Sequence, residues 1–305
     1  MLFKKSKDAM RRIVLISLGA YIWASVLAGC MTPMTPVATP TLPDLRFSGA
    51  GAYKHVEAQV AFGPRPVGTS ANRATADYIA THLRAAGWEV ERQSFEHLGK
   101  SAQNVIAKSG EGDHPILLGA HYDTRPVADQ DRSRPLDPVL GANDGASGVA
   151  VLLELARTLN RARLKQPVWL VFFDAEDMGR LDGWEFSVGA KYMAEHLTTI
   201  PQAVVIVDMI GDADQQIYME ANSSPELSRQ LWDLASRLGL STFIPETKWR
   251  IIDDHLPFRE RGIPAVLLID FDYPYWHTVH DTVDKVSPES LERVGSLLEH
   301  WLESR

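Results

Sequence analysis

The chain has 305 residues, of which 23% are charged and 45% are hydrophobic, so it can bury a sizeable core and is not predominantly disordered. Its formal net charge is −8, which argues against nucleic acid as a partner because phosphate contacts require a basic surface. A single cysteine, Cys30, excludes an intramolecular disulfide.

The first 29 residues have the features of an export signal. Five basic residues precede the apolar run 13–27, which ends in Leu27-Ala28-Gly29-Cys30. This sequence resembles the lipobox of bacterial lipoproteins, and the resemblance implies cleavage before Cys30 and lipidation of its thiol. An uncleaved anchor helix is the alternative, but the run is short for a bilayer span and is interrupted by serine and glycine. We therefore expect residues 1–29 to be a lipoprotein signal peptide.

The predicted signal also determines where the mature chain resides. A lipoprotein is exported and anchored in a membrane, on the periplasmic or cell-surface side. Met31 after the cysteine favours the outer membrane, by resemblance to enterobacterial sorting. Cleavage removes five positive charges and one negative charge, which leaves a net charge of −12. Because Cys30 is lipidated, the mature domain must hold any metal ion with His, Asp or Glu.

After the signal, the chain divides into a tether and one domain. Residues 30–47 begin with Cys30 and are rich in Pro and Thr without apolar periodicity, which is typical of an extended tether. Within 48–305, helices are predicted by the apolar periodicity of 71–87, 144–160, 187–197 and 224–239. Strands are predicted at 88–96, 104–110, 115–120, 168–174, 203–211 and 265–270. This alternation predicts an α/β three-layer sandwich, with a mostly parallel sheet between helices.

Metal-competent side chains follow the predicted strands. Parallel strands place their carboxyl ends at one edge of the sheet, where ligand sites lie. Each side chain alone has an ordinary explanation, such as an N-cap for an Asp before a helix. Their coincidence at one edge predicts a metal site. The residues concerned are His121, Asp123, Asp144, Glu176, Asp177, Asp208 and His277.

The order of these residues resembles that in the zinc aminopeptidases of metallopeptidase family 28 and the related glutaminyl cyclases of animal type. The resemblance spans residues 53–305 and is carried by GAHYDT, GANDGASG, FFDAED, DMIGD, DDHLPF and WHTVHDT. It implies a zinc-exopeptidase-like fold, with Zn²⁺ bound by Asp144, Asp177 and His277 and with Glu176 as proton shuttle. Carboxylates and imidazole suit zinc, and three protein ligands leave a position for substrate.

The resemblance leaves two enzymes to choose between. A di-zinc aminopeptidase would bind a second ion through His121 and Asp208, with Asp144 bridging both ions. A glutaminyl-peptide cyclotransferase, which is an acyltransferase, would use one zinc to convert the N-terminal Gln of peptides to pyroglutamate and ammonia. Two tryptophans favour the cyclase, because aromatic walls would fold the glutamine side chain and exclude water. They are Trp276, directly before His277, and Trp184, in the insertion after the Glu-Asp pair.

Other interpretations of these residues stay open. The presence of both His121 and Asp208 is compatible with a second metal, and either tryptophan can be an ordinary core residue. Asp254, by resemblance, forms hydrogen bonds with Glu176 and Asp208 in a carboxylate cluster that raises a pKa. A third hypothesis is an inactive lipoprotein that binds peptide N termini, although an intact Glu176 argues against it.

Overall fold

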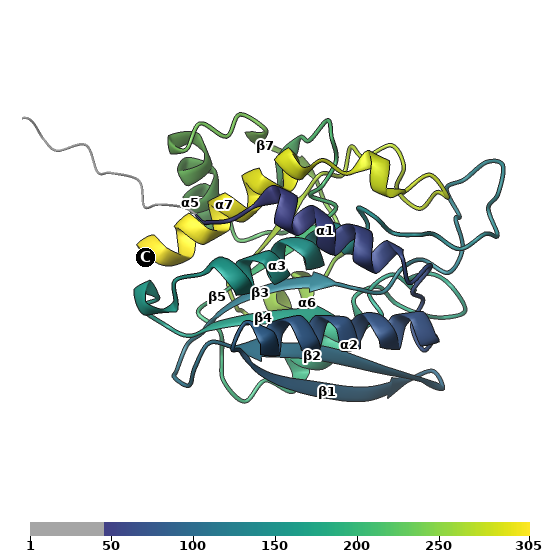
Figure 1. Ribbon diagram of the computed structural model, residues 1–305, viewed down its shortest axis with the longest axis horizontal. Helices are drawn as coiled ribbons and strands as arrows, with labels where there is room; N and C mark the ends of the chain where they lie inside the picture. Colours follow the sequence, from purple (N-terminus) through teal and green to yellow (C-terminus); the bar gives the residue numbers. More distant parts are fainter. Residues whose placement is uncertain (1–45) are drawn as a thin grey trace, which may run out of the picture. The chain divides into compact units, whose positions relative to one another are not determined.

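The computed structural model describes residues 46–305 (Figure 1). A six-stranded sheet runs in the order β1-β2-β4-β3-β5-β8, and β6 and β7 form a separate two-stranded sheet. The strands are β1 (Glu89–His97), β2 (Lys100–Lys108), β3 (Ile116–His121), β4 (Val168–Phe173), β5 (Ala203–Asp208), β6 (Ile217–Glu220), β7 (Phe243–Trp249) and β8 (Ala265–Ile269).

The predicted α/β sandwich is confirmed, with a mixed sheet. β3, β4, β5 and β8 are parallel to one another, whereas β1 and β2 are joined to this core by antiparallel pairing. Every residue of the four parallel strands is buried, because helices cover both faces. Their carboxyl ends therefore meet at one edge.

Helices form the two outer layers. Side chains from α1, α2, α3, α5 and α7 share one core with one face of the sheet, and those of α4 and α6 pack on the other face. Figure 1 shows α1, α3 and α7 side by side on the first face. The helices are α1 (Gly49–Val60), α2 (Ser70–Ala85), α3 (Ala146–Thr158), α4 (Val188–Glu195), α5 (Pro225–Arg237), α6 (Leu256–Glu260) and α7 (Pro288–Ser304), with short 3-10 turns at Arg161–Arg163 and Val283–Lys285.

Two long helices lie outside the set predicted from the sequence. The buried face of α1 consists of Gly49, Ala52, Val56 and Gln59, so its apolar periodicity is weak. By contrast, α7 has a clear apolar period and begins with Ser287 as N-cap and Pro at the first position, which are sequence signals for a helix start. The weak periodicity explains why α1 was not predicted, whereas α7 could have been predicted from its sequence.

Candidate metal centre and active site

Strand order brings the predicted residues together at the carboxyl edge of the sheet. His121 and Asp208 are the last residues of β3 and β5, and Glu176 and Asp177 follow β4 after a short turn. Asp144 precedes α3, and His277 lies in the loop after β8. Two buried groups of potential ligand atoms result, each within 4.8 Å, and both contain Asp144.

The first group consists of Asp144, Asp177 and His277, the three predicted zinc ligands. Nε2 of His277 lies 3.0 Å from Oδ1 of Asp177 and 3.7 Å from Oδ2 of Asp144. Both oxygens of Asp177 and Oδ2 of Asp144 are buried without a hydrogen bond. Three buried carboxylate oxygens without a hydrogen bond, on two adjacent side chains, are costly unless a cation compensates them. This two-oxygen, one-nitrogen donor set fits zinc.

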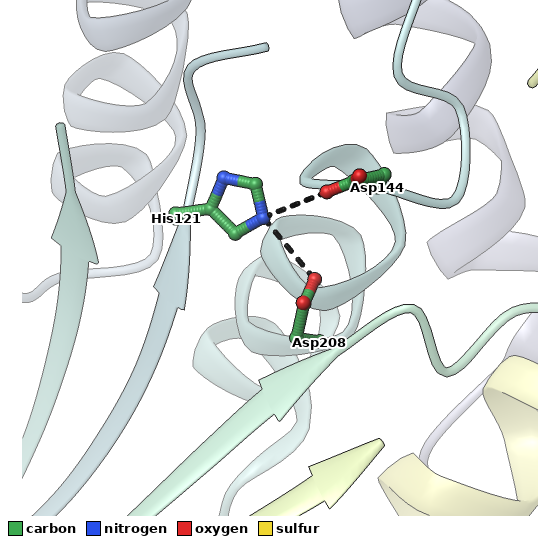
Figure 2. A group of neighbouring side chains, drawn as sticks. All are labelled: His121, Asp144 and Asp208. Atoms are coloured by element: carbon green, nitrogen blue, oxygen red, sulfur yellow. Dashed lines mark hydrogen bonds and ion pairs between the residues drawn. The ribbon is translucent and has the colours of Figure 1, made fainter. Parts of the chain in front are cut away.

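The second group consists of His121, Asp144 and Asp208 (Figure 2). Nε2 of His121 lies 3.1 Å from Oδ1 of Asp208, in a hydrogen bond, and 3.1 Å from Oδ1 of Asp144. Its Nδ1 makes no hydrogen bond, and the nearest carboxylate oxygen, on Asp123, is 3.5 Å away. Metal-binding histidines almost always donate from the second ring nitrogen. His277 has such a partner for its Nδ1 and His121 does not, which favours a metal in the first group.

Asp129 completes the surroundings of His277, and the sequence analysis did not identify it. Its Oδ1 lies 3.0 Å from Nδ1 of His277, which leaves Nε2 facing Asp144 and Asp177. Nη2 of Arg125 donates to Oδ2 of Asp129 at 2.7 Å, and Nη1 donates to the backbone carbonyl of Asp177 at 3.1 Å. One buried arginine thus connects the backbone of Asp177, a predicted ligand, to Asp129, the partner of His277. The sequence gives little indication of this contact, because Asp129 lies in a loop with several aspartates, 148 residues before His277.

We expect Asp129→Ala to weaken zinc affinity by about ten- to a hundredfold, the usual effect of removing a partner of a ligating histidine. The imidazole would lose the acceptor that orients Nε2 toward the metal. Chelator competition measures this affinity directly. Asp137→Asn, an exposed change in the same loop, is the control. Unchanged zinc affinity in Asp129→Ala would show that Asp129 does not position His277.

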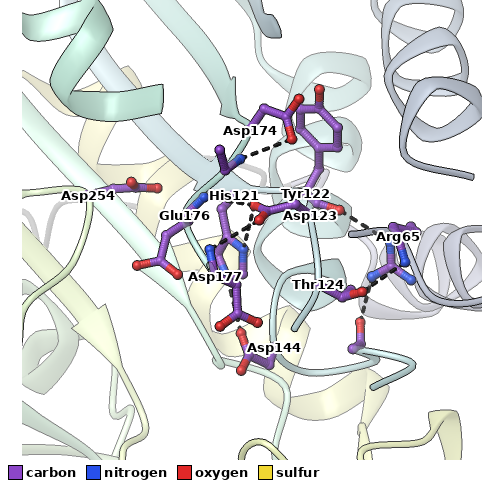
Figure 3. A network of polar contacts seen from close by, with 12 residues as sticks. Arg65, His121, Tyr122, Asp123, Thr124, Asp144, Asp174, Glu176, Asp177 and Asp254 are labelled. Carbon is purple, nitrogen blue, oxygen red and sulfur yellow. Dashed lines mark hydrogen bonds and ion pairs between the residues drawn. The ribbon is translucent and has the colours of Figure 1, made fainter. Parts of the chain in front are cut away.

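Glu176 is buried beside the first group and held by the chain around it. Oγ of Ser187 donates to its Oε1 at 3.2 Å. The backbone N–H groups of Glu176 and Asp177 both donate to the carboxylate of Asp123 (Figure 3). Burial raises the pKa of Glu176 well above its usual value; His121 opposes this shift, and Asp253 and Asp254 reinforce it. A carboxyl group with a raised pKa, next to a metal site, is suited to accept and return a proton.

Asp254 lies in the carboxylate cluster with Glu176 and Asp208 but without the hydrogen bonds that the resemblance implies. It is fully buried, but neither of its oxygens has a hydrogen-bond partner, so the expected bonds to Glu176 and Asp208 are not formed. Burial raises its pKa to about 8; His121 opposes the shift, and Asp123 and Asp208 add to it. Asp254 acts on Glu176 through its charge, which raises the pKa of Glu176 without a hydrogen bond between the two. Asp253, the preceding residue, faces the cavity instead.

A cavity of about 370 Å³ opens above these groups. Its floor includes Asp144, Glu176, Asp177, Asp208 and His277, and its apolar lining includes Phe186, Ile251, Ile252, Phe271 and Trp276. The indole of Trp276 stacks on the imidazole of His277, with ring centroids 3.9 Å apart. This tryptophan therefore forms a wall of the cavity and also packs against a predicted ligand. The volume lies within the range of small-ligand sites.

The structure places Trp184 outside this cavity. Trp184 lies in a turn closed by two backbone hydrogen bonds: its N–H donates to the carbonyl of Leu181, and the N–H of Arg180 donates to the carbonyl of Trp184. The indole packs against His97, with ring centroids 4.7 Å apart. It packs in a small core with Phe95 and lines an adjoining cavity. Phe186, two residues later, takes the place in the main cavity that the sequence analysis assigned to Trp184.

The backbone around the site adopts unusual conformations. His277 has φ 55°, Ala175 before Glu176 has φ 61°, and Met209 after Asp208 has φ 45°. Left-handed conformations are uncommon for residues other than glycine and cluster at functional sites, where surrounding structure holds them. Each of these residues is, or directly adjoins, a predicted site residue.

Comparison with known proteins connects this geometry to one family. The sequence profile of peptidase family M28 matches residues 104–302. A crystal structure of Porphyromonas gingivalis glutaminyl cyclase is 34% identical, with a TM-score of 0.81 over 85% of this chain and 99% of that one. A leucine aminopeptidase precursor from Bacteroides thetaiotaomicron is 32% identical, with a TM-score of 0.80 over 85% and 98%. Leupeptin-inactivating enzyme 1 from Streptomyces exfoliatus is 28% identical over 79% of this chain, which spans about half (53%) of that relative.

Proposed function

This chain belongs to peptidase family M28, and on that premise we propose that it is a zinc-dependent glutaminyl-peptide cyclotransferase. Its substrates are peptides or proteins with an N-terminal glutamine, and its products are the pyroglutamyl peptide and ammonia. The observation that carries this proposal is the difference between the two metal groups. In one group Nδ1 of the histidine, His277, is paired with Asp129, and in the other Nδ1 of His121 has no hydrogen bond. A single metal beside Glu176 suits a cyclase.

The cavity orients the substrate for intramolecular attack. Its acidic floor attracts the α-ammonium group of the peptide, and Trp276 with Phe271 encloses the glutamine side chain. Enclosure brings the α-nitrogen close to the side-chain carbonyl carbon, and this proximity accelerates the intramolecular attack. It also excludes water, which would otherwise compete as the nucleophile. When bound to Asp144, Asp177 and His277, zinc would polarise the side-chain carbonyl.

Glu176 moves the proton that the reaction requires. The α-amino group attacks in its neutral form, after its ammonium has released one proton to solvent. As the bond between the α-nitrogen and the side-chain carbonyl carbon forms, the Glu176 carboxylate accepts a second proton from that nitrogen. The bond from this carbon to the amide nitrogen then breaks, and Glu176 returns the proton to the departing ammonia. Ser187 holds Oε1 in place through its hydroxyl group, and burial keeps bulk water from exchanging the proton.

Two other functions remain as alternatives for the same site. An aminopeptidase would use water and two metals, and the similar Bacteroides thetaiotaomicron protein carries the name of one. An inactive peptide-binding lipoprotein would retain zinc without turnover. A parallel assay separates the three: ammonia release from a Gln-initiated peptide and amino-acid release from a Leu-initiated one. Ammonia alone supports the cyclase, leucine alone supports the peptidase, and neither supports the binding protein.

We also propose that the protein is an exported lipoprotein anchored through Cys30, which lies outside the described residues. Within residues 46–305, no helix has the length and hydrophobicity to cross a bilayer. The proposal rests on the Leu27-Ala28-Gly29-Cys30 sequence after a basic and apolar leader.

Cys30→Ser should release the protein from the membrane fraction or leave it as unprocessed precursor, because lipid chains on one residue supply the anchor. Fractionation and the mass of the mature protein measure both outcomes. Thr32→Ser, a change beside the processing site that keeps the thiol, is the control. Membrane partitioning and normal processing of Cys30→Ser would contradict the lipoprotein proposal.

A further inference from the structure

The mouth of the cavity carries charge opposite to that of its floor. Arg180 and Arg250 are both exposed and both line the cavity, whereas the rest of its lining contains five carboxylates, those of Asp144, Glu176, Asp177, Asp208 and Asp253. Neither arginine lies within 4.0 Å of a carboxylate oxygen in residues 46–305. Other exposed arginines there, such as Arg84, also have no acidic partner, but Arg180 and Arg250 differ from them in that both line the cavity. In a chain with a net charge of −8, two cations without an acidic partner at one opening suggest that a ligand supplies the anion.

Arg180 is held at the mouth by neutral contacts. It has φ 65°, a left-handed conformation maintained by the bond from its N–H to the carbonyl of Trp184 at 2.8 Å. Its guanidinium lies over the ring of Phe186, 5.9 Å from the centroid, while the buried Arg125 lies over the same ring at 5.6 Å. The aromatic ring positions Arg180 without neutralising its charge.

Arg250, which directly follows β7, is also positioned by neutral contacts. Its Nη1 donates to the side-chain oxygen of Asn222, and Nδ2 of Asn222 donates to the carbonyl of Ile251 at 2.9 Å. An amide oxygen accepts a hydrogen bond but carries no net charge. Both arginines are thus partly ordered before a ligand arrives, which lowers the entropic cost of binding an anion.

We infer that Arg180 and Arg250 form an anion-binding subsite that selects peptides with an Asp or Glu directly after the N-terminal glutamine or one position later. This inference rests on the proposed function. With the first residue at the floor, the chain leaves through the mouth and advances at most about 3.6 Å per residue. A carboxylate on the second or third residue therefore comes within reach of the guanidinium groups. Substrates would carry a positive charge at the first residue and a negative charge shortly after it.

The test compares C-terminally amidated Gln-Asp-Ala with Gln-Asn-Ala, which differ in charge but hardly in shape. C-terminal amidation removes the carboxylate of the last residue, which could itself bind the arginines. Gln-Asn-Ala with a free C-terminal carboxylate is assayed as a third peptide, to measure the effect of that terminal charge alone. At low salt we expect kcat/KM for the Asp peptide to exceed that for the Asn peptide by about three- to tenfold, falling toward equality in about 0.5 M salt.

The double variant Arg180→Gln/Arg250→Gln should bring the Asp-to-Asn ratio close to one, whereas Arg180→Lys/Arg250→Lys should keep most of it. Arg84→Gln, an exposed change on α2 outside the cavity, should leave the ratio unchanged. Thermal unfolding checks that each variant is folded. A ratio of one in the wild type, or an unchanged ratio in the double glutamine variant, overturns the inference alone. No ammonia from either peptide overturns the proposed function and this inference with it.

Discussion

Glu176→Gln is expected to lower kcat for a Gln-initiated peptide by about two to four orders of magnitude while zinc content stays close to that of the wild type. The glutamine amide keeps the shape of the side chain and can still accept from Ser187, but it cannot take up the proton of the attacking amine. Since Glu176 belongs to neither metal group, its loss leaves Asp144, Asp177 and His277 in place. Steady-state ammonia release and elemental analysis of the same preparation test both halves of this prediction.

Glu195→Gln provides the matched control, because it makes the same chemical change at an exposed position at the end of α4. We expect it to retain wild-type turnover. If Glu176→Gln instead lost zinc and kept its activity per bound metal, Glu176 would be a ligand and the proton shuttle would have to be sought among the other buried carboxyl groups, with Asp253 and Asp254 as the first candidates.

Asp144→Ala is expected to abolish both zinc binding and activity, because Asp144 belongs to both groups of ligand atoms. The wild type should contain close to one zinc per chain. His121→Ala should keep that count, since the site formed by Asp144, Asp177 and His277 does not need it. Asp177→Ala and His277→Ala should lose the metal. Elemental analysis after dialysis, with thermal unfolding to check the fold, measures these outcomes.

The metal count also separates the two enzymes. A co-catalytic aminopeptidase would contain two tightly bound ions and lose one with His121→Ala. That result, together with efficient release of N-terminal leucine, would replace the cyclase by the peptidase. Ligand variants should also unfold at lower temperature than the zinc-loaded wild type, because an ion that binds only the folded state stabilises it.

The sequence by itself determined the main architecture and the composition of the metal site. Continuous apolar runs identify the buried strands, since a strand covered on both faces needs apolar residues throughout. Parallel strands share one carboxyl edge, so residues after several strands must meet there whatever the details of the loops. Asp144, Asp177, His277 and Glu176 were expected at this edge for that reason, and the structure brings them together, but their roles as ligands and proton shuttle came from the resemblance to family 28.

Only the tertiary structure decided which side chains contact one another within that edge. The bond between His121 and Asp208, the position of Asp129 behind His277 and the burial of Trp184 against His97 all join segments distant in sequence. Side-chain directions at such positions depend on loop dihedral angles, including the left-handed φ of His277 and Arg180, which surrounding packing imposes. Local sequence patterns carry no information on these angles, so the orientation of the ligands and the charge at the cavity mouth emerge only when the loops are folded together.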